Sequence, residues 1–157
     1  MLVRPLNQVV MMDSTHGTNQ HGFSLFTLLV MDEYGNGLPA GWCITSNEKL
    51  TTIALALSKL KDAVHGWTPR TFIVDDADAE IGAIRATFPQ CKILLCLWHV
   101  KRSWIKNLRW KVNGATIEGK VLRVTLMQDL NRLVAFNPQE CITDEQCAQL
   151  ADQVGPD

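Results

Sequence analysis

The sequence predicts an α/β fold in which helices flank a mixed five-stranded sheet. Three short apolar runs, at 8–12, 71–74 and 93–98, are typical of strands buried on both faces of a sheet. The segment 23–45 contains two further strands separated by a turn. Between 46 and 92, apolar residues also recur every three or four positions, which indicates helices between the later strands.

The second and third strands, at 23–31 and 38–45, are predicted to form a hairpin. The dipeptide Asn36-Gly37 lies between them, and both of its residues tolerate the positive φ that tight hairpin turns require. The third strand contains Pro39, which has no backbone N–H to donate to a neighbour. We therefore expect this strand to lie at an edge of the sheet or to carry a bulge.

A helix is predicted after the hairpin, because the spacing of apolar residues changes at Ser46. Ser46 or Asn47 can cap this helix, and Glu48 then lies in its first turn, where the helix dipole favours an acidic side chain. The residues of its apolar face are Leu50, Ile53, Ala54, Leu57, Leu60 and Val64. Their spacing is that of an amphipathic helix.

A second helix is predicted after the strand at 71–74, with Asp76 or Asp78 as its cap. Its apolar face is formed by Ile81, Ile84 and Phe88. The remaining helices are predicted around Val100, Trp104 and Leu108, from Ile117 to Val134, and from a capping box at Thr143 and Gln146 through Val154.

The order of elements restricts the topology. Because crossover connections are right-handed, the strand after the first helix should be parallel to one of the earlier strands. This arrangement is typical of ribonuclease-H-like folds, whereas three successive strands joined by short turns do not suit a flavodoxin-like domain. We expect a ribonuclease-H-like core at 1–112, followed by a helical segment at 113–157 that begins an insertion.

The composition is that of a soluble globular protein. Of 157 residues, 46% are hydrophobic and 20% are charged, and the formal net charge is −1. This charge gives no overall attraction to nucleic acid, so DNA binding would depend on local clusters. The five cysteines form no Cys-x-x-Cys pair, and the longest apolar run is too short to span a bilayer. These features favour a reducing compartment, cytosolic or nuclear, over secretion.

Two of the predicted strands are followed by an aspartate, the first by Asp13 and the fourth by Asp75. If these strands are parallel neighbours, the two carboxylates face each other beyond the ends of the strands, where ligands bind in open α/β sheets. Mg²⁺ and Mn²⁺ prefer carboxylate oxygens, and pairs of such ions assist phosphodiester transfer. The alternative is that the aspartates only cap helices or solvate loops.

Several segments together resemble a known family. The run 13–19, Asp75, the pair Phe88-Pro89 and the run 96–99 are similar in order and spacing to the catalytic domain of Mutator-like element (MULE) transposases. The same core occurs in plant far-red-response transcription factors and in relatives that carry SWIM zinc fingers. The resemblance covers roughly residues 7 to 112.

The resemblance implies a DDE-type site in which two aspartates and a later glutamate bind Mg²⁺ or Mn²⁺ and drive DNA strand cleavage and transfer. By position, Asp13 and Asp75 are the catalytic, metal-binding carboxylates, with Asp76 as the alternative to Asp75. The later glutamate normally follows a helical insertion, and none in this chain has the expected distance. The glutamates beyond the core are Glu118, Glu140 and Glu145.

We therefore expect a fragment of a transposase catalytic domain, inactive if the third carboxylate is missing. A non-catalytic DNA- or protein-binding module on the same fold is the alternative. DNA is the expected partner, a homo-oligomer is compatible with this assignment, and neither a membrane nor a small-molecule substrate is expected. The resemblance favours a nuclear location, with the cytoplasm as the alternative.

The histidines and Cys96 have several interpretations. Cys96 can be a core residue, and His99 a residue that begins a helix. Cys-x-x-His also occurs near the active centre in the resembling family, and it is half of a zinc site, although no second half with suitable spacing is evident. His16 is a loop histidine that could also shape the site or contact DNA. Glu48 matches a place where an acidic residue is common in the family.

A basic segment follows His99. Arg102, Lys106 and Arg109 share one face of the predicted helix, and Lys101 lies beside them. Three tryptophans are interleaved with these residues: Trp98, Trp104 and Trp110. The segment is either a solvated helix face or a DNA-binding surface in which charge neutralises phosphates and the rings supply stacking area.

Overall fold

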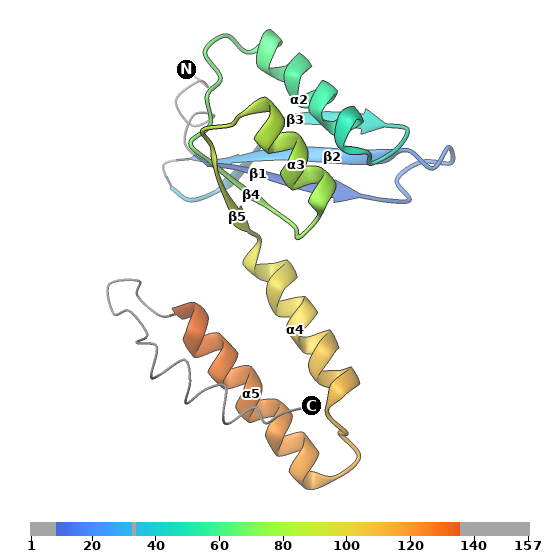
Figure 1. Cartoon of the computed structure of the whole chain (residues 1–157), viewed down its shortest axis with the longest axis vertical. Coiled ribbons are helices and arrows are strands. Elements are labelled where there is room, and N and C mark those ends of the chain that lie inside the picture. Colours follow the sequence, from blue (N-terminus) through green and yellow to red (C-terminus); the bar gives the residue numbers. More distant parts are fainter. Residues whose placement is uncertain (1–8, 33, 136–157) are drawn as a thin grey trace. The chain divides into compact units, whose positions relative to one another are not determined.

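The computed structural model describes residues 9–32 and 34–135, which form a five-stranded sheet and four helices (Figure 1). The elements are β1 (Val9–Thr15), β2 (Ser24–Met31), β3 (Gly37–Thr45), α2 (Leu50–Ala63), β4 (Thr71–Val74), α3 (Asp78–Thr87), β5 (Lys92–Leu95), α4 (Leu97–Lys111) and α5 (Ile117–Ala135). The strand order is β3-β2-β1-β4-β5. β1, β2 and β3 are antiparallel neighbours, whereas β1, β4 and β5 run parallel. The predicted fold class is confirmed.

The first and fourth strands lie side by side, as predicted. β1 and β4 pair in parallel from Val9 opposite Thr71 to Met11 opposite Ile73. The crossover through α2 returns the chain to the start of the sheet, which accounts for the parallel direction of β4. Because successive positions keep this register, Asp13 and Asp75 follow the paired segments at equivalent places.

The proline-bearing strand β3 lies at one edge of the sheet and also carries an irregularity. Leu28 of β2 pairs with Gly41, but Leu29 pairs with Pro39, so Ala40 is an extra residue in β3. Both features follow from the missing N–H of Pro39, which a central, regular strand would need for its ladder. The prediction for this strand is confirmed.

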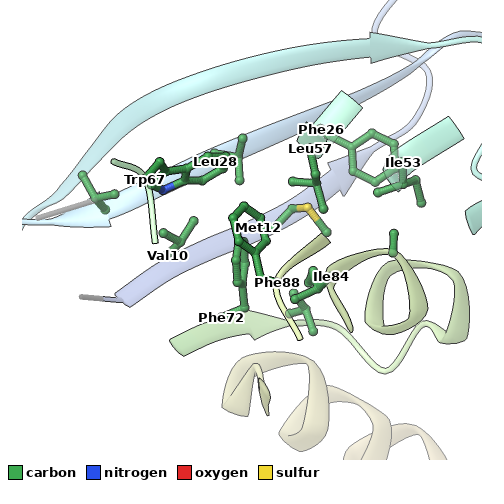
Figure 2. Close-up of a cluster of buried hydrophobic side chains, with 13 residues drawn as sticks. Val10, Met12, Phe26, Leu28, Ile53, Leu57, Trp67, Phe72, Ile84 and Phe88 are labelled. Carbon is green, nitrogen blue, oxygen red and sulfur yellow. The ribbon is translucent and has the colours of Figure 1, made fainter. Parts of the chain in front are cut away.

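Helices α2 and α3 cover one face of the sheet, and the hydrophobic core lies between them and the strands (Figure 1). Alternate residues of β1, β2 and β4 point toward the helices, since side chains of a strand alternate between faces. The core residues labelled in Figure 2 are Val10, Met12, Phe26, Leu28, Ile53, Leu57, Trp67, Phe72, Ile84 and Phe88. Trp67, Phe72 and Phe88 form an aromatic group with ring centroids 5.0 to 6.4 Å apart.

The last apolar run does not form the strand that was predicted. β5 ends at Leu95, and Leu97 already belongs to α4. β5 is an edge strand, with Leu94 42% and Leu95 45% exposed, so the prediction of burial on both faces is wrong for this strand. An apolar run that crosses from a strand into a helix cannot be divided by composition alone.

The predicted helix caps are also corrected. α2 begins at Leu50 after the cap position Lys49, so Glu48 precedes the helix and does not lie in its first turn. Asn47 lies two residues before the cap position, and its side chain accepts a hydrogen bond of 3.1 Å from the backbone N–H of Lys49. α3 has Ala77 at its cap position, and no described side chain caps it, so neither Asp76 nor Asp78 serves this role.

The hairpin between β2 and β3 is held by a different residue from the one predicted. Gly35 has the positive φ, at 83°, and among the described residues only glycines have a positive φ, which excludes Asn36. The carboxylate of Asp32 accepts hydrogen bonds from the N–H groups of Tyr34 and Asn36 and closes the turn. The helix predicted from Thr143 to Val154 lies outside the described residues.

The chain divides into two compact units, residues 1–103 and 104–157. In the second unit, Arg123 of α5 donates hydrogen bonds of 2.9 Å to the carbonyl oxygens of Arg109 and Val112, at the carboxyl end of α4. The predicted domain boundary at residue 112 stays a prediction. None of the helices within 9–32 and 34–135 is long and apolar enough to cross a membrane.

Candidate active site

Two aspartates occupy equivalent positions beyond the parallel pairing of β1 and β4. Asp13 lies within β1, opposite Thr27 of β2, because β1 continues three residues further than predicted, to Thr15. Asp75 directly follows the last residue of β4. Their side chains are 54% and 48% exposed, so both carboxylates are accessible to a ligand from solvent.

The imidazole of His99 lies between these two carboxylates. Its Nε2 is 3.8 Å from Oδ1 of Asp13, and its Nδ1 is 3.8 Å from Oδ1 of Asp75. These distances exceed hydrogen-bond length, so the contacts are electrostatic. The ring is only 23% exposed, and its buried Nδ1 has no hydrogen-bond partner among the described residues. One ring therefore separates the two acids.

Backbone contacts of Cys96 hold His99 in this place. The N–H of Cys96 donates a hydrogen bond of 2.6 Å to the carbonyl oxygen of Val74, the residue before Asp75. The carbonyl oxygen of Cys96 accepts a bond of 3.0 Å from the N–H of Val100, which closes the first turn of α4. The backbone of Cys96 thus connects the end of β4 to the start of α4. His99, three residues after Cys96, lies on the first turn of α4.

A second pair of ionisable groups lies at Glu48 and His16. Oε1 of Glu48 is 3.3 Å from Nδ1 of His16, which follows β1 directly. This contact between Glu48 and His16 does not have the geometry of a hydrogen bond. In the described part of the chain, the buried Oε1 of Glu48 therefore has no hydrogen-bond partner. Since Glu48 precedes α2, it is available to this cluster and not to the helix dipole.

Glu80, on the first turn of α3, is an additional member of the site that the sequence analysis did not identify. It is only 4% exposed, and its Oε2 has no hydrogen-bond partner within the described residues. Burial raises the pKa of Glu80 from 4.5 to about 7. A hydrogen bond with Ser14 lowers this pKa in part, whereas the negative charges of Asp75, Asp13 and Glu48 raise it further.

A signal for Glu80 was present in the sequence. Glu80 precedes Ile84 by four residues and Phe88 by eight, so it lies on the apolar face of α3. An acidic residue on a core-facing helical stripe is unusual and deserved a functional interpretation.

The donor set fits a hard divalent cation. Asp13, Asp75, Glu48 and Glu80 offer carboxylate oxygens, which suit Mg²⁺ or Mn²⁺ better than zinc. Buried atoms without partners in the described chain surround the pair: Glu48 Oε1, Glu80 Oε2 and His99 Nδ1. However, no three Asp, Glu, His or Cys side chains within 9–32 and 34–135 are already arranged to hold a metal ion. The structure therefore does not provide a formed zinc site at Cys96 and His99.

The predicted basic face lies on α4. Arg102, Lys106 and Arg109 are exposed, while Lys101 is half-buried. The guanidinium of Arg102 lies 5.1 Å from the ring centroid of Trp98, which is 60% exposed. Trp110 is 88% exposed. The helix thus presents cations and aromatic surface to solvent, and their use in DNA binding stays a prediction.

Comparison with known proteins gives one family and a set of distant structures. The family model for the RNaseH-like domain of zinc finger SWIM domain-containing protein 1/3 matches residues 3–94. No curated protein matches the chain in sequence.

Among solved structures, the catalytic core domain of BIV integrase shares 12% identity, with 87% of this chain and 75% of that chain covered and a TM-score of 0.41. The HTLV-2 integrase catalytic core domain in complex with magnesium shares 17% identity, covering 65% and 68%, with a TM-score of 0.39. A simian T-cell lymphotropic virus intasome in complex with PP2A regulatory subunit B56 gamma shares 14%, covering 76% and 47%, with a TM-score of 0.38.

Proposed function

Because the chain belongs to the RNaseH-like domain family of zinc finger SWIM domain-containing protein 1/3, we propose that it carries a divalent-cation site for phosphodiester transfer on DNA, of the Mutator-like DDE type. The observation that carries this proposal is the placement of Asp13 and Asp75 on either side of His99. Fold membership alone does not establish chemistry, so the argument depends on these three side chains.

Asp13 and Asp75 are the residues that would hold Mg²⁺ or Mn²⁺. When bound, such an ion supplies Lewis-acid activation of a phosphoryl oxygen and of the attacking oxygen. The carboxylates supply the negative charge that retains it, and both remain open enough to leave room for a phosphate. The ring of His99 lies between the two acids and contacts both.

The basic face of α4 would bind the DNA backbone. Arg102, Lys106 and Arg109 are exposed at i, i+4 and i+7, which supports contact with successive phosphates. Trp98 adds a ring beside Arg102, and exposed aromatic rings stack on bases without sequence preference. A nuclear location and self-association are part of the same proposal, and both can be tested by imaging a fluorescent fusion and by sedimentation.

The test compares Asp13→Asn and Asp75→Asn with the matched control Asp62→Asn, at an exposed position near the carboxyl end of α2. Mn²⁺ binding to the complete chain is measured from the electron paramagnetic resonance signal of free Mn²⁺, and cleavage of a labelled DNA duplex is followed in parallel. We expect either site variant to weaken Mn²⁺ binding at least about tenfold, as loss of even an indirect contributor costs that much. Equal affinity in all four proteins would dismiss the site.

A second candidate function is a non-catalytic DNA-binding module. The observation that favours it is the basic and aromatic face of α4, which requires no carboxylate to bind a phosphate backbone. The same variants separate the two functions. If Asp13→Asn and Asp75→Asn leave DNA affinity unchanged and the wild type shows no Mn²⁺-dependent cleavage, the binding module is supported.

A further inference from the structure

Glu80 is a buried carboxylate that the fold alone does not explain. It is 4% exposed, and Oε2 has no partner among the residues that the structure describes. Its neighbours on the same helix, Ala83 and Ile84, are core residues with no exposed surface. A buried, unpartnered polar atom is costly, and an apolar residue of similar size would avoid that cost. A ligand that binds near Glu80 would explain why a carboxylate occupies this position.

The groups that face Glu80 come from three other elements. Ser14 of β1 forms a hydrogen bond with it, and Asp13 is the residue before Ser14. Asp75, which follows β4, and Glu48, which precedes α2, act on it through their negative charges, as Asp13 does. All of these neighbours are acids or a hydroxyl, and none supplies positive charge. A cation held by Asp13 and Asp75 is the group that would compensate the carboxylate.

Glu80 reaches the aspartates from the opposite side of β1. Val10 and Met12 face the core, so Ser14 continues on the side of α3, whereas Asp13 points to the other side. No three acidic, histidine or cysteine side chains in the described chain already form a metal-binding group. Glu80 is thus placed behind the aspartate pair and linked to it through Ser14.

We infer that Glu80 is a positioning residue for the cation site, which holds the end of β1 through Ser14 and adds negative charge behind the two aspartates. This inference rests on the proposed function. It adds a buried acid of α3 to the site, and the later glutamate expected beyond an insertion stays a prediction. The Ser14–Glu80 hydrogen bond fixes the residue next to Asp13, and groups that surround metal ligands affect how tightly the ligands bind.

The experiment measures the Mn²⁺ dissociation constant of the complete chain by electron paramagnetic resonance. Glu80→Gln retains the shape of the side chain and removes its charge, whereas Glu80→Asp retains the charge. Glu118→Gln, at an exposed position of α5, is the matched control. We expect Glu80→Gln to weaken Mn²⁺ binding roughly 10- to 100-fold, Glu80→Asp to recover part of the loss, and the control to match the wild type.

The outcomes separate the inference from the proposed function. Circular dichroism first tests whether Glu80→Gln is folded, and a folded variant is expected because the amide has no charge to bury. If Glu80→Gln binds Mn²⁺ as tightly as the wild type while Asp13→Asn does not, Glu80 is only a structural residue and the inference is wrong. If Asp13→Asn also binds like the wild type, the cation site itself is absent and the proposed function fails with it.

Discussion

Replacing Glu80 with glutamine should change how the stability of the folded protein depends on pH. The carboxyl group has its pKa raised to about 7 in the folded protein, against 4.5 as an ordinary glutamate, chiefly because it is buried. At pH 4.5 the group is half ionised in the unfolded chain, and below this pH it is mostly protonated in both states, so the shift affects stability little there. Between pH 4.5 and 7 the unfolded chain releases its proton while the folded protein retains it, so the free energy of unfolding falls as the pH rises.

The size of the effect follows from the two pKa values. The rise from 4.5 to about 7 corresponds to about 3 kcal/mol of stability lost above pH 7. Glutamine cannot ionise, so Glu80→Gln should be more stable than the wild type at pH 8 and close to it at pH 4.5. For a chain of this length, about 3 kcal/mol corresponds to roughly 6–12 °C in Tm.

The assay is urea unfolding followed by circular dichroism at both pH values, in EDTA so that no cation compensates the carboxylate. The control is Glu118→Gln, which removes an exposed carboxylate of α5 and should leave the pH dependence as it is in the wild type. A difference between Glu80→Gln and the wild type that is the same at pH 4.5 and pH 8 would refute the reasoning. Such a result would mean that water reaches the carboxylate in the folded protein, or that the unfolded chain raises the pKa of Glu80 by the same amount.

Three other predictions concern different parts of the chain. The double variant Arg102→Gln and Arg109→Gln should reduce the slope of log affinity for duplex DNA against log salt concentration by about 2, because each phosphate contact contributes about 0.9. An unchanged slope would show that these residues of α4 do not contact DNA. Ile84→Ala, at a fully buried core position, should cost roughly 2–5 kcal/mol in urea unfolding, whereas Val121→Ala, at an exposed position, should cost little. Cys96→Ala should keep Mn²⁺ affinity within about twofold of the wild type, because the hydrogen bonds of Cys96 at the start of α4 are made by its backbone; a large loss would indicate a direct role for the thiol.

The topology of the sheet could be predicted because it depends on local signals and one general rule. Pro39 places its strand at the edge, the turn residues near Gly35 join β2 to β3, and the crossover rule makes β4 parallel to an earlier strand, which the structure shows to be β1. The end of β5 could not be predicted, since residues on both sides of Cys96 are apolar. The helix begins there because the N–H of Cys96 bonds to Val74, a contact between distant segments.

The candidate site was predictable only in part, for a related reason. Asp13 and Asp75 each follow an apolar run, so the position of each aspartate along its own strand can be predicted from the sequence. The contact between His16 and Glu48 joins a loop after β1 to a loop before α2, and no spacing rule connects them. The place of Glu80 on the apolar face of α3 is visible in the sequence, but its proximity to Ser14, Asp75 and Glu48 arises only in the folded chain.

The two candidate functions place different demands on Glu80, and this favours the cation site. A DNA-binding module needs the cations of α4, and a buried carboxylate on α3 contributes nothing to phosphate binding. For such a module, methionine or leucine at position 80 would preserve the packing and remove the cost of an unpartnered oxygen. A cation site, in contrast, gains from a third negative charge behind Asp13 and Asp75. Residues that reduce stability without serving the fold are typical of functional sites, and Glu80 is such a residue.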